Sequence, residues 1–297
     1  MRRFFIERQL RSGYTRRTMK TSVALALALV LTSPAIWAGE NPTPESISQK
    51  SLSFIGTPEA RVKMNARALD GLAGVRAVLG GFGTMEGTSM VATRGRDFRI
   101  RFFFDRPDYK SEDILHVGDK TTIGVISPGV KSDLGNFLQF FPELLRDGLF
   151  GGELSGGWPL ANLEERGAKL KMRGNKKMDG KNLIEVQYIP HKGNSDLQIF
   201  LYFDPSNYQH VMTRYEAPDQ GMGRGTQNWS TGMNSPNSVD HKMFLEERFS
   251  DYGPVGDINL PLRWKIKLVN SQGKQIDYEA VFRSMHPTVT DATFEQH

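Results

Sequence analysis

Apolar and polar residues alternate with a period of two through long stretches of this chain. Between residues 98 and 104 every even-numbered position is Phe or Ile, and Arg99 and Arg101 lie between them. Residues 184–188 and 262–268 repeat the alternation. Because successive side chains of a strand point to opposite faces, this pattern predicts half-buried antiparallel strands. Each such strand needs neighbouring strands and a core on one face, which restricts the fold to a sheet.

Turn signals separate these strands at short intervals. Asp179-Gly180 is the strongest, because a type I′ hairpin turn needs positive φ angles at both central residues. Gly118-Asp119-Lys120 and residues 271–274 predict further hairpins. Strands joined locally favour a mainly β (α+β) fold with one antiparallel sheet over alternating βαβ units. Residues 39–297 are expected to form a single domain.

Four stretches depart from the alternation. A first helix is expected from about Pro44 to Lys63, and a flexible loop at about 217–240, where Gly, Asn, Gln and Ser predominate. The glycine-rich residues 148–158 predict a flexible turn. Before them, residues 131–149 carry the apolar stripe of an amphipathic helix, formed by Leu134, Phe137, Leu138, Phe141, Leu144 and Leu145.

The N-terminus has the pattern of a secretory signal peptide. Arg16, Arg17 and Lys20 precede an apolar run at residues 23–31, and a small residue, Ala38, ends the segment. The run is much shorter than the ~20 residues that a membrane-spanning helix needs, so no integral membrane anchor is expected. Cleavage near Ala38 predicts release into the periplasm. Translation starting at Met19 would also give a complete signal, and both Sec and twin-arginine export remain open.

Charge and cysteine content exclude several classes of function. Residues 1–38 contain seven Arg or Lys and one Glu, whereas the whole chain has a net charge of +5, so residues 39–297 have a net charge of −1. Binding to nucleic acid needs clustered surplus cations and is therefore not expected. The chain has no cysteine, which excludes disulfides, thiolate nucleophiles and lipid attachment to a cysteine after the cleavage site.

No motif for catalysis or metal binding is found. The six histidines show no i, i+4 pair and are expected at solvated strand ends, so neither a metal site nor a cofactor is expected. Ser155 lacks the surroundings of a nucleophile elbow. The acidic pairs Glu112-Asp113, Glu164-Glu165 and Glu246-Glu247 are expected on exposed polar faces, because adjacent strand residues point in opposite directions. We therefore expect no enzymatic activity and no catalytic residues.

Several segments resemble the LolA-type outer-membrane lipoprotein-sorting superfamily, in particular a poorly characterised branch of it. The resemblance extends from about residue 45 to residue 285 and is carried by residues 53–60, 141–149, 201–205, 248–252 and 260–264, which include Leu-Tyr-Phe-Asp-Pro and Arg-Phe-Ser-Asp-Tyr. It implies a curved antiparallel half-barrel of the LolA/LolB type, covered by helices, with an apolar cavity that accepts acyl chains.

This resemblance implies a soluble periplasmic carrier that binds lipid or the acyl chains of lipoproteins. A sensor or scaffold that binds an envelope protein partner, without transporting lipid, is the alternative. The helix at 131–149 is then expected to act as a lid over a cavity walled by strand residues. The residues expected to line the cavity or the lid are Phe102, Phe104, Phe137, Phe141, Leu144, Trp158 and Trp264.

Overall fold

The computed structural model describes residues 42–78, 83–191, 197–217, 243–270 and 273–295. These residues form one antiparallel sheet of twelve strands. The predicted signal peptide and nearly all of the predicted loop at 217–240 lie outside the described residues. The strands are β1 (Ala66–Ala77), β2 (Thr84–Arg94), β3 (Asp97–Arg106), β4 (Tyr109–Val117), β5 (Lys120–Ile123), β6 (Lys169–Met178), β7 (Lys181–Ile189), β8 (Gln198–Phe203), β9 (His210–Glu216), β10 (Phe244–Val255), β11 (Ile258–Val269) and β12 (Gln275–His286).

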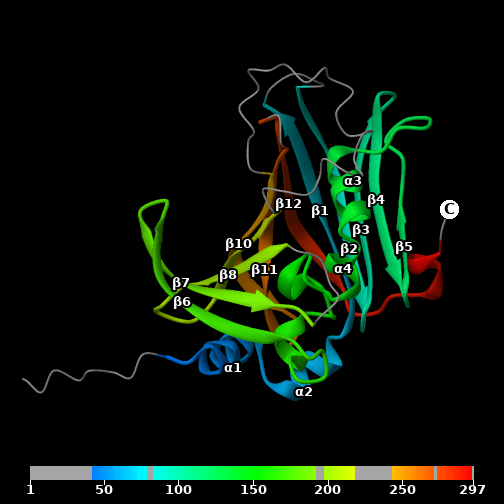
Figure 1. Ribbon diagram of the computed structural model, residues 1–297. Helices are drawn as coiled ribbons and strands as arrows, with labels where there is room; N and C mark the ends of the chain where they lie inside the picture. The colour runs from blue at the N-terminus through cyan, green and yellow to red at the C-terminus, as the bar shows by residue number, and fades with distance from the viewer. Residues whose placement is uncertain (1–41, 79–82, 192–196, 218–242, 271–272, 296–297) are drawn as a thin grey trace, which may run out of the picture. The chain divides into compact units, whose positions relative to one another are not determined.

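The strand order follows the chain except at one place. Strands that follow one another in sequence pair, except β5 and β6, which are the two edges of the sheet, and β1 pairs with β12. This is the order of a barrel that is open between β5 and β6. The sheet is strongly curved, and helices lie against it (Figure 1). The predicted fold class, a curved antiparallel sheet covered by helices, is therefore confirmed.

The predicted hairpin turns have the expected geometry. Asp179 and Gly180 have φ angles of 49° and 81°, and Gly118 has a φ angle of 59° between β4 and β5. The Asp-Gly pair thus supplies the two positive φ angles that a type I′ turn requires.

Both predicted helices are interrupted in the structure. The first consists of α1 (Pro44–Ile55) and α2 (Pro58–Lys63), because the Thr57 side chain caps a new helix by accepting a hydrogen bond from the Ala60 amide. The second consists of α3 (Asp133–Phe140) and α4 (Glu143–Arg146). Phe141 leaves the helical conformation, and Pro142 has no amide proton to continue the ladder. Three short 3₁₀ helices complete the set, η1 (Gly152–Leu154), η2 (Pro159–Asn162) and η3 (Asp291–Phe294).

The two faces of the sheet differ in character. Large apolar side chains from most strands and from α1, α3, α4 and η1 form one continuous core. On the opposite face, neighbouring strands are joined by ion pairs such as Arg76–Asp277 at 2.9 Å and Lys265–Glu279 at 3.4 Å. Exposed pairs of this kind contribute little to stability, ~0–1 kcal/mol each, and mainly keep this face solvated. Within the described residues, none of the helices combines the length and apolarity that a membrane crossing requires.

Candidate functional site

The segment that joins the two sheet edges fills the concave face. This closing segment, residues 124–168, runs from β5 to β6 and contains α3, α4, η1 and η2. Its apolar side chains pack into the main core with the inward-facing residues of the sheet. At most 5% of each of these side chains is exposed: Leu134, Phe137, Leu138, Phe141, Leu144, Leu145, Leu149, Phe150, Leu154, Trp158 and Leu160.

All seven residues predicted to line a cavity or a lid are buried, and six of them belong to two neighbouring groups. On the sheet, the Phe102 ring lies 6.2 Å from the Trp264 ring, and Phe104 packs against Tyr109. On the closing segment, the rings of Phe137 and Phe141 lie 5.0 Å apart, and Leu144 is fully buried beside them in the same core. The seventh, Trp158, stacks on His210 at 5.0 Å.

A buried carboxyl group holds the start of α3. Glu112, on β4, accepts a hydrogen bond of 2.8 Å from the Ser132 hydroxyl, which in turn accepts one of 2.8 Å from the Gly135 amide. Ser132 is the N-cap of α3. Tyr109 and Tyr278 also donate to Glu112. Burial raises the pKa of Glu112 to about 7, although these donors lower it. One sheet residue thus fixes the N-terminus of the helix by hydrogen bonds.

A second buried carboxyl group holds the turn after α4. Glu247, on β10, accepts hydrogen bonds from the Gly151 amide at 2.8 Å and from the Trp264 indole at 2.9 Å. The Tyr215 hydroxyl lies 2.7 Å from Glu247 and 2.9 Å from the Leu149 carbonyl oxygen. Burial raises the pKa of Glu247 to about 8. At neutral pH a protonated Glu247 can donate to Tyr215, which leaves the tyrosine proton for Leu149.

A buried arginine holds η1. The Arg67 guanidinium, on β1, donates to the carbonyl oxygens of Glu153 at 2.8 Å and Leu154 at 3.1 Å, and to that of Met64 at 2.6 Å. Burial lowers the pKa of Arg67 to about 10, so the group is still charged at neutral pH. Sheet residues therefore hold the closing segment at three separate points.

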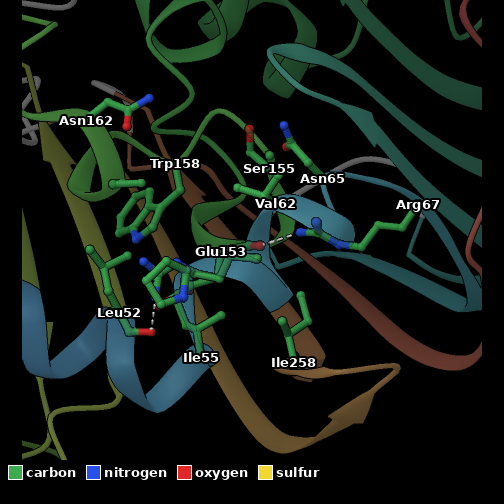
Figure 2. A pocket seen from close by; sticks show the side chains of 14 residues that line it. Leu52, Ile55, Val62, Asn65, Arg67, Glu153, Ser155, Trp158, Asn162 and Ile258 are labelled. Carbon is green, nitrogen blue, oxygen red and sulfur yellow. Dashed lines mark hydrogen bonds between the residues drawn. The ribbon is translucent and has the colours of Figure 1, made fainter.

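A pocket of about 340 Å³ lies beside the Arg67 contact. Leu52, Ile55 and Ile258 line its lower edge in Figure 2, and the polar side chains of Asn65, Ser155 and Asn162 line its upper edge. Of the seven predicted residues, Trp158 is the one among its lining residues. A pocket with one apolar side and several hydrogen-bonding groups suits an amphiphilic molecule.

Behind the pocket, a carboxylate, an imidazole and a hydroxyl form a buried series. Glu153 Oε2 lies 3.0 Å from His210 Nδ1, and His210 Nε2 lies 2.9 Å from the Thr213 hydroxyl. The order resembles the relay of a hydrolase. Thr213 is completely buried, however, and is not among the lining residues of the pocket, so its hydroxyl does not meet a molecule bound there.

The prediction of exposed acidic and histidine residues was wrong for several of them. Glu112, Glu246, Glu247, His116 and His210 are at most 4% exposed. A period-two signal could have identified Glu247, because it shares the inward face of β10 with its apolar neighbours at positions 245 and 249. No comparable pattern in the sequence indicated that Arg67 and Glu153 would be buried. No group of three or more His, Asp or Glu side chains is placed to hold a metal ion in the described part of the chain.

The known proteins that resemble this chain do so in their solved structures. No protein-family model and no curated protein matches the chain. A LolA superfamily protein from Nitrosomonas europaea aligns with a TM-score of 0.48 and 12% identity, over 86% of this chain and 98% of that one. A DUF1329 family protein from Desulfovibrio piger aligns with a TM-score of 0.47 and 10% identity, over 86% and 98% of the two chains.

A third similar structure is a putative outer membrane lipoprotein-sorting protein domain from Vibrio parahaemolyticus, with a TM-score of 0.42 and 10% identity over 80% of this chain and 92% of that one. A LolA superfamily protein is thus among the solved structures to which this chain is similar. Identities of 10–12% assign no ligand and no partner to this chain.

Proposed function

We propose that this protein is a soluble periplasmic carrier that binds lipid or the acyl chains of lipoproteins on the concave face of its sheet. The closing segment carries this proposal. It spans the gap between the two sheet edges, and its apolar side chains cover an apolar sheet face. An acyl chain that replaced α3 and α4 on this face would contact Phe102, Phe104 and Trp264 in place of Phe137, Phe141 and Leu144.

The exchange restores the cover of the sheet because an acyl chain is as apolar as the helices. Burial of apolar surface contributes about 25 cal/mol per Å², so the acyl chain regains the contacts that the sheet face loses, whereas the displaced helices lose the burial of their own apolar side chains. The specific cost of opening lies in the hydrogen bonds from Glu112, Glu247 and Arg67, each worth ~1–3 kcal/mol where a charged or buried group is involved. Displacement of the closing segment therefore needs a ligand with a long apolar chain.

The pocket beside Arg67 suits the polar end of such a ligand. Arg67 Nε and Trp158 Nε1 are buried donors without a hydrogen-bond partner among the described residues. Both residues line the pocket, together with the apolar Leu52 and Ile258. A carbonyl or an anionic headgroup would satisfy these donors, while its chain extends along the apolar side.

Lipid extraction tests the proposal directly. The protein is purified from the periplasmic fraction without detergent, extracted with organic solvent and analysed by lipid mass spectrometry. We expect a phospholipid or acylated species in stoichiometric amount. Protein that is folded and free of lipid, and that also takes up no fluorescent palmitic-acid analogue, would contradict the carrier function.

A substitution on the closing segment localises the binding face. Phe141→Asp places a charge against the rings of Phe137 and Phe140, which lie within 5.0 Å of Phe141. Because this charge weakens the packing of the closing segment on the sheet, we expect the variant to take up the fluorescent fatty acid at a lower probe concentration than the native protein, with the circular-dichroism signal of the sheet retained. Uptake equal to that of the native protein in a folded variant would show that α3 and α4 do not cover the binding face.

One observation favours a sensor or scaffold as the second candidate. The concave face is already filled by the chain's own residues, so the fold is complete without a ligand. An envelope protein partner would then bind elsewhere on the molecule and no lipid would be recovered. Lipid mass spectrometry separates this candidate from the carrier.

A further inference from the structure

The hairpin formed by β6 and β7 carries an unusual concentration of positive charge. Residues 169–181, here called the basic hairpin, contain six Lys or Arg and one acid, Asp179, a surplus of five positive charges. Because residues 39–297 together have a net charge of −1, the remainder of this region has a surplus of six acidic residues. The charge of the exported chain is therefore strongly asymmetric.

Most of these cations have no acidic partner. Lys176 pairs with Glu185 at 3.0 Å, and Asp179 is paired with Arg248 on β10. Among the described residues, no carboxylate lies within salt-bridge distance of Lys171, Arg173 or Lys177, and all three side chains are exposed. These three charges are available to an external partner.

The hairpin is placed to meet a large surface. β6 is the last strand of the sheet, and the hairpin turn extends away from the other strands (Figure 1). From Lys169 to Lys177 the strand is roughly 25 Å long at 3.3 Å per residue. Leu170 and Met172 point inward and pack against the core, so Lys169 and Lys171 point outward. The register then shifts between Met172 and Gly174, and Lys177, opposite Asn182, lies on the other face of the hairpin. The charges thus lie on both faces of the hairpin, at the rim of the molecule.

We propose that the basic hairpin docks the protein on a bilayer rich in anionic phospholipid. Separated cations on both faces of an extended hairpin match a layer of anionic headgroups, because the headgroups can move laterally to each cation. A folded acidic protein would instead have to hold its carboxylates in register with cations on both faces. Ile189 on β7, 38% exposed and paired with Lys169, adds an apolar contact near the headgroups. This docking is independent of any ligand in the concave face.

Vesicle sedimentation at low and high salt tests this proposal. With vesicles of phosphatidylglycerol and phosphatidylcholine, we expect binding that disappears in pure phosphatidylcholine and weakens steeply with salt, since charges are screened within about 8 Å at physiological ionic strength. Each cation near an anionic surface strengthens binding about five-fold. The triple variant K171Q/R173Q/K177Q should therefore bind on the order of 100-fold more weakly.

A matched triple variant controls for net charge. K110Q/K120Q/R283Q removes two Lys and one Arg that are exposed on β4, β5 and β12, outside the hairpin. We expect it to keep most of the vesicle binding and to melt at the same temperature as the hairpin variant. If both variants lost vesicle binding equally, only the net charge of the protein would matter, and the proposal would be overturned.

Two further outcomes would also overturn it. Lysine on an exposed edge strand prevents pairing with another chain, so a hairpin variant that aggregates with unchanged vesicle binding would assign the cations to edge protection. Binding of the protein to polyglutamate without binding to anionic vesicles would assign them to an acidic protein partner.

Discussion

At the scale of single residues, the closing segment is controlled by two buried carboxyl groups. The pKa values of Glu112 and Glu247, about 7 and about 8, exceed their ordinary value of 4.5 because both groups are buried. In the native protein each group therefore holds its proton more tightly than in the unfolded chain. Their contribution to stability is complete below about pH 4.5 and is lost as the pH rises through 7 to 8.

The double variant E112Q/E247Q tests this linkage, because an amide resembles the protonated carboxyl in shape and does not titrate. We expect the free energy of unfolding of the native protein to fall relative to that of the variant between pH 5 and pH 8. The change is at most about 1.4 kcal/mol per pH unit and group. Urea unfolding at a series of pH values measures it.

Burial lowers the pKa of His116, so this residue changes the free energy of unfolding with pH in the opposite direction. The difference between the native protein and the variant is therefore more informative than the pH dependence of the native protein alone. A difference between the two proteins that stays constant with pH would contradict the assignment to Glu112 and Glu247.

The sequence predicted which apolar residues of the closing segment are buried, but not which polar residues are buried beside them. The spacing of Phe137, Phe141 and Leu144 is a helical pattern that any apolar covering surface requires, and all three residues are buried. Glu112 and Arg67 occupy ordinary strand positions, and their burial depends on a segment that reaches them from elsewhere in the chain. The pattern of apolar and polar residues along a strand does not reveal which distant segment will pack against it.

At the scale of elements, the glycine-rich residues 148–158 form a close-packed turn. Gly151 and Gly152 have positive φ angles, and a Cβ on Gly152 would lie 2.8 Å from the Phe249 ring. Phe249 belongs to β10, next to the inward-facing Glu247 that binds Gly151. The glycines thus bring the closing segment into direct contact with the sheet.

Two glycine substitutions distinguish the effect of the close contact with Phe249 from the effect of a positive φ angle. Gly152→Ala introduces both a positive-φ strain and a clash with Phe249, and we expect a loss of about 2–4 kcal/mol in unfolding free energy. Gly129→Ala is the control, because its φ angle of 74° is also positive but no atom lies near its added Cβ. It should lose only about 1–2 kcal/mol. Equal losses in urea unfolding would contradict a packing role for Gly152.

The elements themselves were largely predictable, and their ends were not. Residues 98–104 and 262–268 lie in β3 and β11 as the alternation predicts. The two helices are shorter than predicted because Gly56-Thr57-Pro58 and Phe141-Pro142 interrupt them. Both breaks carry a proline signal that outweighs a continuous apolar stripe.

At the scale of the whole molecule, the order of strands determines the function we propose. Hairpins account for the sequential pairing, whereas the pairing of β1 with β12 joins the two ends of the chain. No local signal predicts that pairing. It leaves β5 and β6 as edges and makes the segment between them the natural cover of the concave face.

The proposed location is tested by the N-terminus of the exported protein. We expect the chain to start near Gly39 and to be recovered from the periplasmic fraction without detergent, because the apolar run at 23–31 is short and no cysteine follows it. N-terminal sequencing that finds Met1 or Met19 in a membrane pellet would contradict this.

The central claim is that the closing segment must leave the concave face before a ligand binds there. A disulfide between α3 and β5 tests it most directly. A Cβ on Gly135 would lie 2.7 Å from Ile123 Cγ2, close enough for the variant I123C/G135C to form a bond. The native chain has no cysteine, so this pair is the only one present. Each single variant serves as a control.

Uptake of a fluorescent palmitic-acid analogue is measured with the double variant oxidised and then reduced. We predict that the oxidised protein stays folded and takes up little of the probe, and that reduction restores uptake to the level of the single variants. Full uptake by the oxidised protein, or none by the native protein, would contradict the claim.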